Sequence, residues 1–142
     1  MPKVCDEIKI NSMVLVRFNA AVENGKIKVK KPHENFSNII RASANKVGDS
    51  YLLSETDIQL LALALELKMQ GKQPKIITDD YSIQNVAKQN CIEFYALATF
   101  GIRRVLNWLR YCPACYREYP INTAFSDCQV CGTELKRKPK KQ

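Results

Sequence analysis

Two pairs of cysteines near the C-terminus constrain this 142-residue chain more than any other feature. The pairs are Cys112-Pro-Ala-Cys115 and Cys128-Gln-Val-Cys131, with twelve residues between them. Four thiolates on two tight turns form the tetrahedral sulfur ligand set that zinc prefers. The alternative is two disulfides, which are usual in secreted chains. We favour zinc because no segment has the pattern of a signal peptide. The predicted zinc site is structural, because the protein fills all four ligand positions.

The charge of the chain points to a polyanionic partner. The formal net charge is +8, and 46% of the residues are hydrophobic, which is ordinary for a globular protein. We expect nucleic acid rather than a membrane, because no amphipathic anchor or bilayer-length apolar run accompanies the charges. A disordered, solubilising C-terminal end is the alternative for the last residues. A cytoplasmic protein is expected. The candidate RNA-binding residues are Arg103, Arg104, Arg110, Arg117, Lys136, Arg137 and Lys138.

The order of the predicted elements indicates an α/β fold. Helices are predicted over Ser12–Glu23, Glu34–Lys46, a segment that follows Ser54, Ser82–Gln89 and Gly101–Arg110, and strands over Lys26–Val29, Lys75–Thr78 and Cys91–Tyr95. Alternating strands and helices predict a mainly parallel sheet covered on both faces, which gives three α/β/α layers. We expect an α/β domain over residues 1–110, a zinc ribbon over 111–135 and a basic tail over 136–142.

The helix that follows Ser54 has the clearest signals. Ser54 is a candidate N-cap, and Asp57 lies three residues later, where a capping box places an acid. Leucine, isoleucine and alanine surround the next three turns on nearly all sides. A helix that is apolar all round is a buried one. Gly71 and Pro74 are expected to end it.

Among the 14 acidic residues of this basic chain, those at three places are the candidate metal ligands: Asp6-Glu7, Asp57 and Asp79-Asp80. Carboxylate oxygens are the ligands that Mg²⁺ and Mn²⁺ prefer, and two such ions can assist attack on a phosphodiester. Each acid also has a simpler explanation. Asp57 can complement the dipole of its helix, Asp79 or Asp80 can cap the next helix, and the first pair can be solvated.

Two blocks of sequence carry a resemblance to a known family. The first is Ser54-Glu55-Thr56-Asp57-Ile58, followed by the apolar run Leu61–Leu67, and the second is Thr78-Asp79-Asp80-Tyr81-Ser82, followed by Gln84-Asn85-Val86-Ala87. Together they resemble PIN-domain nucleases. The added four-cysteine ribbon resembles the Nob (Nin-one-binding) endoribonucleases, and the compact length resembles the archaeal members.

The resemblance implies a Mg²⁺- or Mn²⁺-dependent endoribonuclease that matures the 3′ end of small-subunit ribosomal RNA. Precursor small-subunit RNA and the small ribosomal subunit are then the implied partners. It further implies that Glu7, Asp57 and Asp80 hold the catalytic metal ions, with Asp79 as an assisting neighbour. The hydroxyl of Thr78 is implied to orient water, and the ribbon to hold the RNA.

One family feature is missing. Such domains open with a central strand that ends in an aspartate, and here Met1-Pro2-Lys3-Val4 already matches the Thr-Pro-x-Val that follows this strand. A misassigned start, a truncation and a natural variant each explain this, and we favour the first. The rival hypothesis is a non-catalytic RNA- or ribosome-binding module with a degenerate site. A third, a zinc-ribbon DNA-binding factor, leaves the acidic blocks unexplained.

Overall fold

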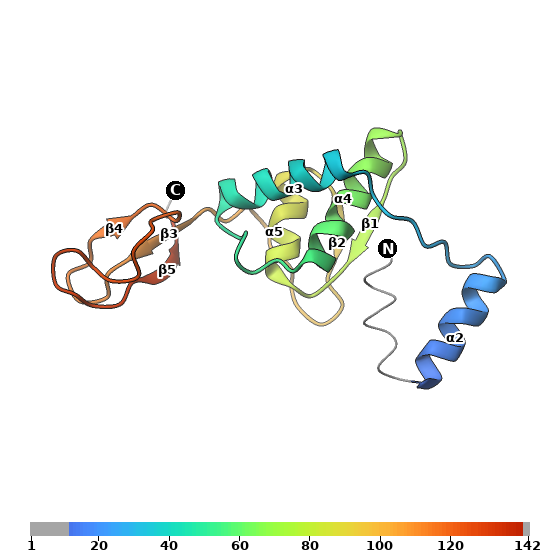
Figure 1. Ribbon diagram of the computed structural model, residues 1–142, viewed down its shortest axis with the longest axis horizontal. Coiled ribbons are helices and arrows are strands. Elements are labelled where there is room, and N and C mark those ends of the chain that lie inside the picture. Colours follow the sequence, from blue (N-terminus) through green and yellow to red (C-terminus); the bar gives the residue numbers. More distant parts are fainter. Residues whose placement is uncertain (1–11, 141–142) are drawn as a thin grey trace.

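The computed structural model describes residues 12–140 of the chain. Four helices and two parallel strands form an α/β part, and three antiparallel strands form a smaller C-terminal part (Figure 1). The elements are α2 (Ser12–Glu23), α3 (Glu34–Val47), α4 (Glu55–Met69), β1 (Lys75–Ile77), α5 (Tyr81–Gln89), β2 (Glu93–Tyr95), β3 (Trp108–Tyr111), β4 (Glu118–Tyr119) and β5 (Lys136–Pro139). No helix within residues 12–140 is long and apolar enough to cross a bilayer.

Helix α4 is the centre of the α/β part. Its capping box forms as predicted, because the Asp57 N–H donates to Ser54 Oγ while the Ser54 N–H donates to Asp57 Oδ2 at 2.8 Å. Ile58, Leu61 and Leu65 are buried between α3 and α5. Each such side chain contributes roughly 1.5–3 kcal/mol on burial. The prediction of a buried helix is therefore confirmed.

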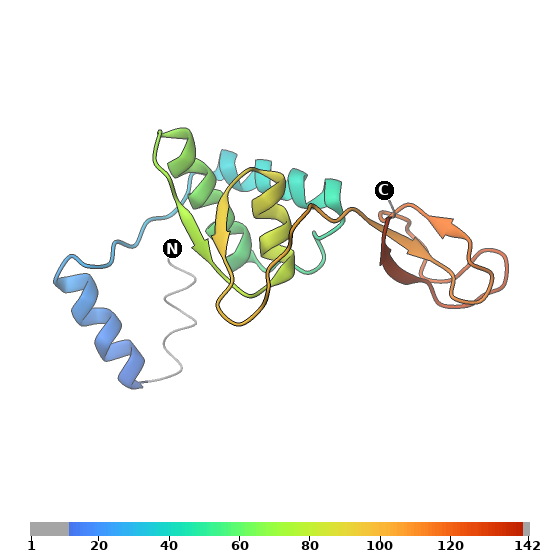
Figure 2. The same cartoon turned by 180° about the vertical axis from the view of Figure 1, so that it is seen from behind.

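The parallel sheet is small in the described residues. Strands β1 and β2 pair with Ile76 opposite Phe94, and Ile76 is buried while its neighbours Lys75 and Ile77 are exposed. Figures 1 and 2 show α3, α4 and α5 on one face of this pair of strands. The mixed α/β architecture is confirmed. The three-layer arrangement stays a prediction, since within residues 12–140 helices cover one face of this sheet.

Two predicted elements are wrong. The segment predicted as a strand over Lys26–Val29 has no strand partner and runs as an irregular connection from α2 to α3. The helix predicted over Gly101–Arg110 is a loop followed by β3, because Gln84 Oε1 and Asn85 Oδ1 accept hydrogen bonds from the Ile102 and Leu106 N–H groups. These tertiary hydrogen bonds outweigh the helical propensity of the segment.

The C-terminal part is an antiparallel sheet in the order β4-β3-β5. Residues 136–139, predicted as the start of a basic tail, instead form β5, with Arg137 opposite Arg110 on β3. Since β3 begins at Trp108, the sheet starts before the predicted boundary at residue 111. We call this sheet with its two cysteine turns the ribbon.

A buried carboxylate on α4 ties down the connection that follows α2. The Glu66 side chain is 2% exposed and forms an ion pair with Lys30. Its other oxygen accepts the His33 N–H at 2.9 Å, just before α3. The hydrogen bond from Lys30 lowers the pKa of Glu66 below its ordinary value of 4.5, and the His33 N–H adds to this effect. The contribution of Glu66 to stability is therefore complete above about pH 4.5 and is lost as the pH falls through its lowered pKa.

We expect Glu66→Gln to lower the free energy of unfolding by about 2 kcal/mol at neutral pH, because a charge-assisted hydrogen bond is lost. The loss should shrink as the pH falls below about 4.5. Urea unfolding followed by circular dichroism, at several pH values, measures this difference. Glu93→Gln is the matched control, since Glu93 is 67% exposed and its pair with Lys75 is solvated. Equal effects of the two substitutions would contradict this role of Glu66.

Candidate metal centre and acidic edge

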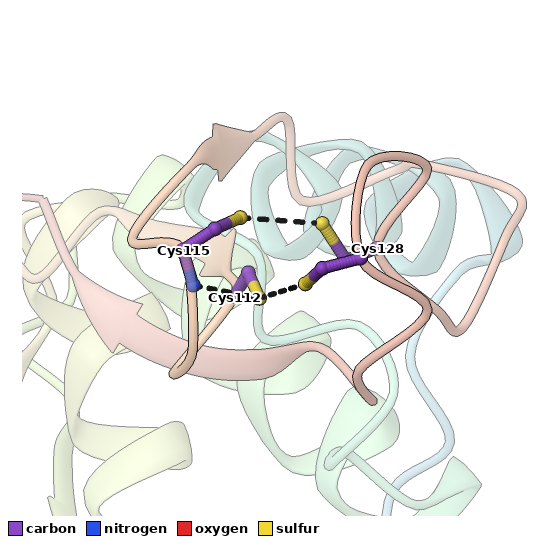
Figure 3. Close-up of side chains that lie close together, drawn as sticks. Cys112, Cys115 and Cys128 are labelled. Atoms are coloured by element: carbon purple, nitrogen blue, oxygen red, sulfur yellow. Dashed lines mark hydrogen bonds between the residues drawn. The ribbon is translucent and has the colours of Figure 1, made fainter.

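The four ribbon cysteines form one compact cluster. Their sulfur atoms lie within 4.8 Å of one another, and within residues 12–140 no other group of three or more His, Cys, Asp or Glu side chains is positioned to hold a metal ion. Cys115 Sγ lies 3.5 Å from Cys128 Sγ (Figure 3). Cys112 Sγ lies 3.3 Å from Cys131 Sγ. Each C-x-x-C pair thus has a sulfur close to a sulfur of the other pair, and the four sulfur atoms are near enough to surround one metal ion.

Local backbone geometry creates the two cysteine turns. The Cys115 N–H donates to Cys112 Sγ at 3.4 Å, which closes the first turn. In the second turn, the Gly132 N–H donates to the Cys128 carbonyl at 2.9 Å, and Gly132 has φ of 72°. A side chain is disfavoured at that φ, so glycine suits this position. Gly132 follows the second pair as the turn requires.

The thiols of Cys112, Cys115 and Cys128 differ in pKa. The Tyr119 hydroxyl, 3.1 Å from Cys128 Sγ, lowers the pKa of Cys128 to about 6. The Cys115 N–H lowers the pKa of Cys112. An N–H from Arg117 lowers the pKa of Cys115, but the neighbouring Cys128 sulfur and burial raise it, to a net value of about 11. Four thiolates at this separation repel one another, and a bound dication offsets that repulsion. The donor set fits a soft divalent metal such as zinc.

The candidate acids share one edge of the α/β part. The start of α4, the end of β1 and the start of α5 lie at the same edge in both ribbon views (Figures 1 and 2). Asp57 stands in the first turn of α4, and Asp79 and Asp80 connect β1 to α5. Glu7, the remaining candidate, lies outside the described residues. The structure thus brings elements that carry three of the four predicted acids to one edge.

Each of the three aspartates uses one oxygen to hold the fold. Asp57 Oδ2 accepts the Ser54 N–H and hydroxyl in the capping box. Asp80 Oδ1 accepts the Ser82 and Ile83 N–H groups as the N-cap of α5. Asp57 and Asp80 therefore do have structural roles at the starts of their helices, Asp57 in the first turn of α4 and Asp80 as the N-cap of α5. The second oxygen of each has no hydrogen bond or ion pair within residues 12–140.

Asp79 organises the loop that follows β2. Its Oδ1 accepts the N–H groups of Leu97, Ala98 and Thr99, each at 3.0 Å, and the Thr99 hydroxyl at 3.1 Å. The Ala98 N–H and then the Thr99 N–H lower the pKa of Asp79, so this carboxylate stays ionised at neutral pH. Asp79 is thus an anchor for the loop, with its second oxygen left for another ligand.

A cavity of about 450 Å³ lies between this edge and the ribbon. Asp79 and Asp80 line it, and Asp57 does not. Sequence reasoning missed two of its lining residues, Asp49 and Asn85, which are each 1% exposed. Burial raises the pKa of Asp49, although hydrogen bonds from Asn85 and Arg137 favour its ionised form. Nothing in the sequence indicated that Asp49, an acidic residue in the loop after a helix, is buried.

The predicted RNA-binding residues fall into two groups. Arg103, Arg104, Arg117 and Lys136 are exposed. The other three make contacts within the protein. Arg110 donates to the Phe125 carbonyl at 2.8 Å, Lys138 pairs with Glu118 at 2.8 Å, and Arg137 stacks on Trp108 with 3.9 Å between the guanidinium carbon and the ring centre.

Comparisons with known proteins identify the family of this chain. Residues 1–67 match the family described as PIN domain of ribonuclease. Endoribonuclease Nob1 of Methanothermobacter thermautotrophicus is 35% identical over 137 residues, which cover 95% of this chain and 78% of that protein. Endoribonuclease Nob1 of Pyrococcus abyssi is 33% identical over 141 residues, which cover 99% of this chain and 83% of that protein. The chain belongs to the Nob1 family of PIN-domain endoribonucleases.

The family assignment extends over both parts of the molecule. The alignments with the Nob1 proteins span nearly the whole chain and so include the ribbon. Ribonuclease VapC1 of Thermoplasma acidophilum is 36% identical over 111 residues, which cover 78% of this chain and 54% of that protein. The chain is therefore homologous to two kinds of ribonuclease. The PIN match includes Asp57 and ends before Asp79 and Asp80.

We expect one zinc ion per chain, released when Cys131 is replaced by Ser, because a three-sulfur site loses much of its affinity. Metal analysis of the purified protein by mass spectrometry measures this. Cys91→Ser is the matched control, because Cys91 is exposed and lies in the turn after α5, outside the ribbon. Native protein without zinc, or a Cys131→Ser variant that keeps it, would contradict the assignment.

Proposed function

We propose that this chain is a divalent-metal-dependent endoribonuclease that cleaves precursor small-subunit ribosomal RNA at its 3′ end in the cytoplasm. Near full-length similarity to endoribonucleases named Nob1 is the observation that carries the proposal. The small ribosomal subunit is the implied partner. In this account the zinc of the ribbon is structural, and Mg²⁺ or Mn²⁺ serves the reaction.

The acidic edge supports this proposal through its free oxygens. Asp57, Asp79 and Asp80 are each fixed in orientation by hydrogen bonds to one oxygen, so the other oxygen is held in place at little entropic cost. Fixed carboxylate oxygens are suitable ligands for Mg²⁺ or Mn²⁺. When bound, these ions supply charge neutralisation for attack on the phosphodiester. Glu7 is proposed as a further ligand by its place in the family motif.

The chain's own residues then have distinct tasks. The hydroxyl of Thr78 accepts the Asp80 N–H at 3.1 Å, which fixes the turn between β1 and α5 where Asp80 begins the helix. Arg103, Arg104, Arg117 and Lys136 are exposed cations that we assign to the RNA phosphates. Phe100, fully exposed beside Gly101, offers a surface on which an unpaired base can stack.

A non-catalytic RNA- or ribosome-binding module is the second candidate. Two observations favour it. All three described aspartates have structural roles, and within residues 12–140 no three carboxylates form one ligand group. This candidate keeps salt-sensitive RNA binding and lacks cleavage at any metal concentration.

We expect Asp57→Asn and Asp80→Asn each to abolish Mn²⁺-dependent cleavage of a precursor RNA that contains the 3′ end of the small-subunit RNA. Asparagine is as good an N-cap as aspartate, and at Asp57 it keeps an oxygen for the capping box, so both helices should persist while the charged metal ligand is lost. Gel analysis of the RNA products measures cleavage, and circular dichroism checks the fold.

Glu55→Gln is the matched control, because Glu55 stands in the same turn of α4 and pairs with Arg41 on the surface. It should cleave like the native chain. Cleavage that survives both aspartate substitutions would contradict the nuclease proposal. A native chain that binds the RNA tightly and never cuts it would support the binding module instead.

A further inference from the structure

We propose that Arg137 is a positioning residue that fastens the ribbon to the α/β part, so that the RNA-binding surface and the acidic edge move as one body. The functional half of this inference rests on the proposed nuclease activity. Its structural half does not, because the fastening is a property of the free protein. It also reassigns Arg137, which the sequence predicted to contact RNA.

The Arg137 guanidinium joins the two parts directly. Arg137 lies on β5 of the ribbon, and its NH1 group donates to the Gly48 carbonyl at 3.0 Å and to Asp49 Oδ1 at 3.3 Å. Both acceptors belong to the turn that ends α3. The guanidinium also stacks on the ring of Trp108, at 3.9 Å. A planar cation that stacks and donates at once is a role for which lysine is a poor substitute.

On the α/β side, the partner of Arg137 is a carboxylate that needs it. Asp49 is 1% exposed, and a buried carboxylate without a partner is strongly destabilising. Its second oxygen accepts a hydrogen bond from Asn85 Nδ2 on α5. The same amide donates to the Leu106 carbonyl at 2.8 Å and accepts the Leu106 N–H at 2.7 Å. Asn85 therefore ties α5, the end of α3 and the connection to the ribbon into one network.

Close packing surrounds this network. A Cβ atom built on Gly48 would lie 2.7 Å from Ile121 Cγ1 and 3.0 Å from Trp108 Cβ, both in the ribbon. Gly48 also has φ of 85° and ends α3 in the left-handed conformation. Glycine is thus required twice at this position, once for the backbone and once for the close approach of the ribbon. The ribbon therefore packs against Gly48 with no room for a side chain, as expected if the two parts are held in a fixed orientation.

The joint lies beside the candidate acids. Arg137, Asp49 and Asn85 line the same cavity as Asp79 and Asp80. Lys136, the preceding residue on β5, is exposed, and adjacent strand residues point to opposite faces. The strand therefore directs one cation inward to the joint and its neighbour outward. Fixing β5 fixes the direction from which RNA bound to the ribbon reaches the acidic edge.

The first test measures rotational motion in the free protein, without RNA. We expect ¹⁵N relaxation of the native zinc-loaded chain to give one rotational correlation time for both parts. In Asp49→Asn and Arg137→Gln the ribbon amides should give a shorter correlation time than those of α3, α4 and α5. Lys136→Gln, which removes the adjacent exposed charge, should keep one rotational correlation time for both parts, like the native chain. Arg137→Lys should be intermediate.

Amide shifts within each part, together with retained zinc, show whether a variant is folded. Arg137→Gln acts from the more exposed side, since Arg137 is 30% exposed, and serves where Asp49→Asn fails to fold. A single correlation time shared by the native chain and every folded variant would overturn the proposal. So would separate correlation times in the native chain.

The second test separates a positioning role from direct RNA contact. Asp49→Asn keeps every positive charge, so loss of the joint should lower kcat by roughly 10- to 100-fold while KM stays near its native value. If Arg137 instead contacts RNA, Asp49→Asn should leave kcat unchanged, and Arg137→Gln alone should weaken binding. A native chain that never cleaves RNA would contradict the proposed function. The ¹⁵N relaxation measurement would then still test whether Arg137 fastens the ribbon.

Discussion

The arrangement of this molecule depends on two adjacent buried amides, Gln84 and Asn85, in the middle of α5. Gln84 and Asn85 are 0% and 1% exposed, and each uses both ends of its amide to bind main-chain groups of the connection to the ribbon or of the turn after β1. A buried amide is costly unless it is satisfied, so these bonds fix where the chain must run. They hold residues 102–106 in a non-helical connection that leads to β3, beside the end of α3.

The acidic edge combines structural and chemical roles in the same side chains. Capping and loop-anchoring bonds occupy one oxygen of each aspartate and orient the other. The simple structural explanation and the catalytic hypothesis are thus compatible, because a ligand whose orientation is already fixed loses little entropy on binding a cation. The ribbon follows a similar rule. Its four sulfurs and the hydroxyl of Tyr119 form a preset environment in which a dication offsets the repulsion between thiolates.

Sequence reasoning succeeded where short-range signals decide the structure. The capping box at Ser54, the buried helix that follows it and the two cysteine turns all depend on residues within a few positions of one another. It failed where distant contacts decide. The residues after Gly101 have a helical pattern, but hydrogen bonds with the amides of α5 hold them in an irregular loop. Arg137 and Lys138 were predicted as RNA-binding residues of a basic tail, and pairing with β3 makes them part of a strand. Asp49 gave no sign of burial, because its partners lie 36 and 88 residues away.

Binding of Mn²⁺ to the acidic edge is the measurement that decides whether Asp57, Asp79 and Asp80 are metal ligands. Titration of the ¹⁵N-labelled, zinc-loaded chain with Mn²⁺ should broaden the amide signals at the starts of α4 and α5 and after β1 more strongly than those of the ribbon. Excess Mg²⁺ should reverse the broadening, because both ions prefer carboxylate oxygens. Broadening that is absent there, scattered over the surface or insensitive to Mg²⁺ would contradict the assignment of Asp57, Asp79 and Asp80 as metal ligands.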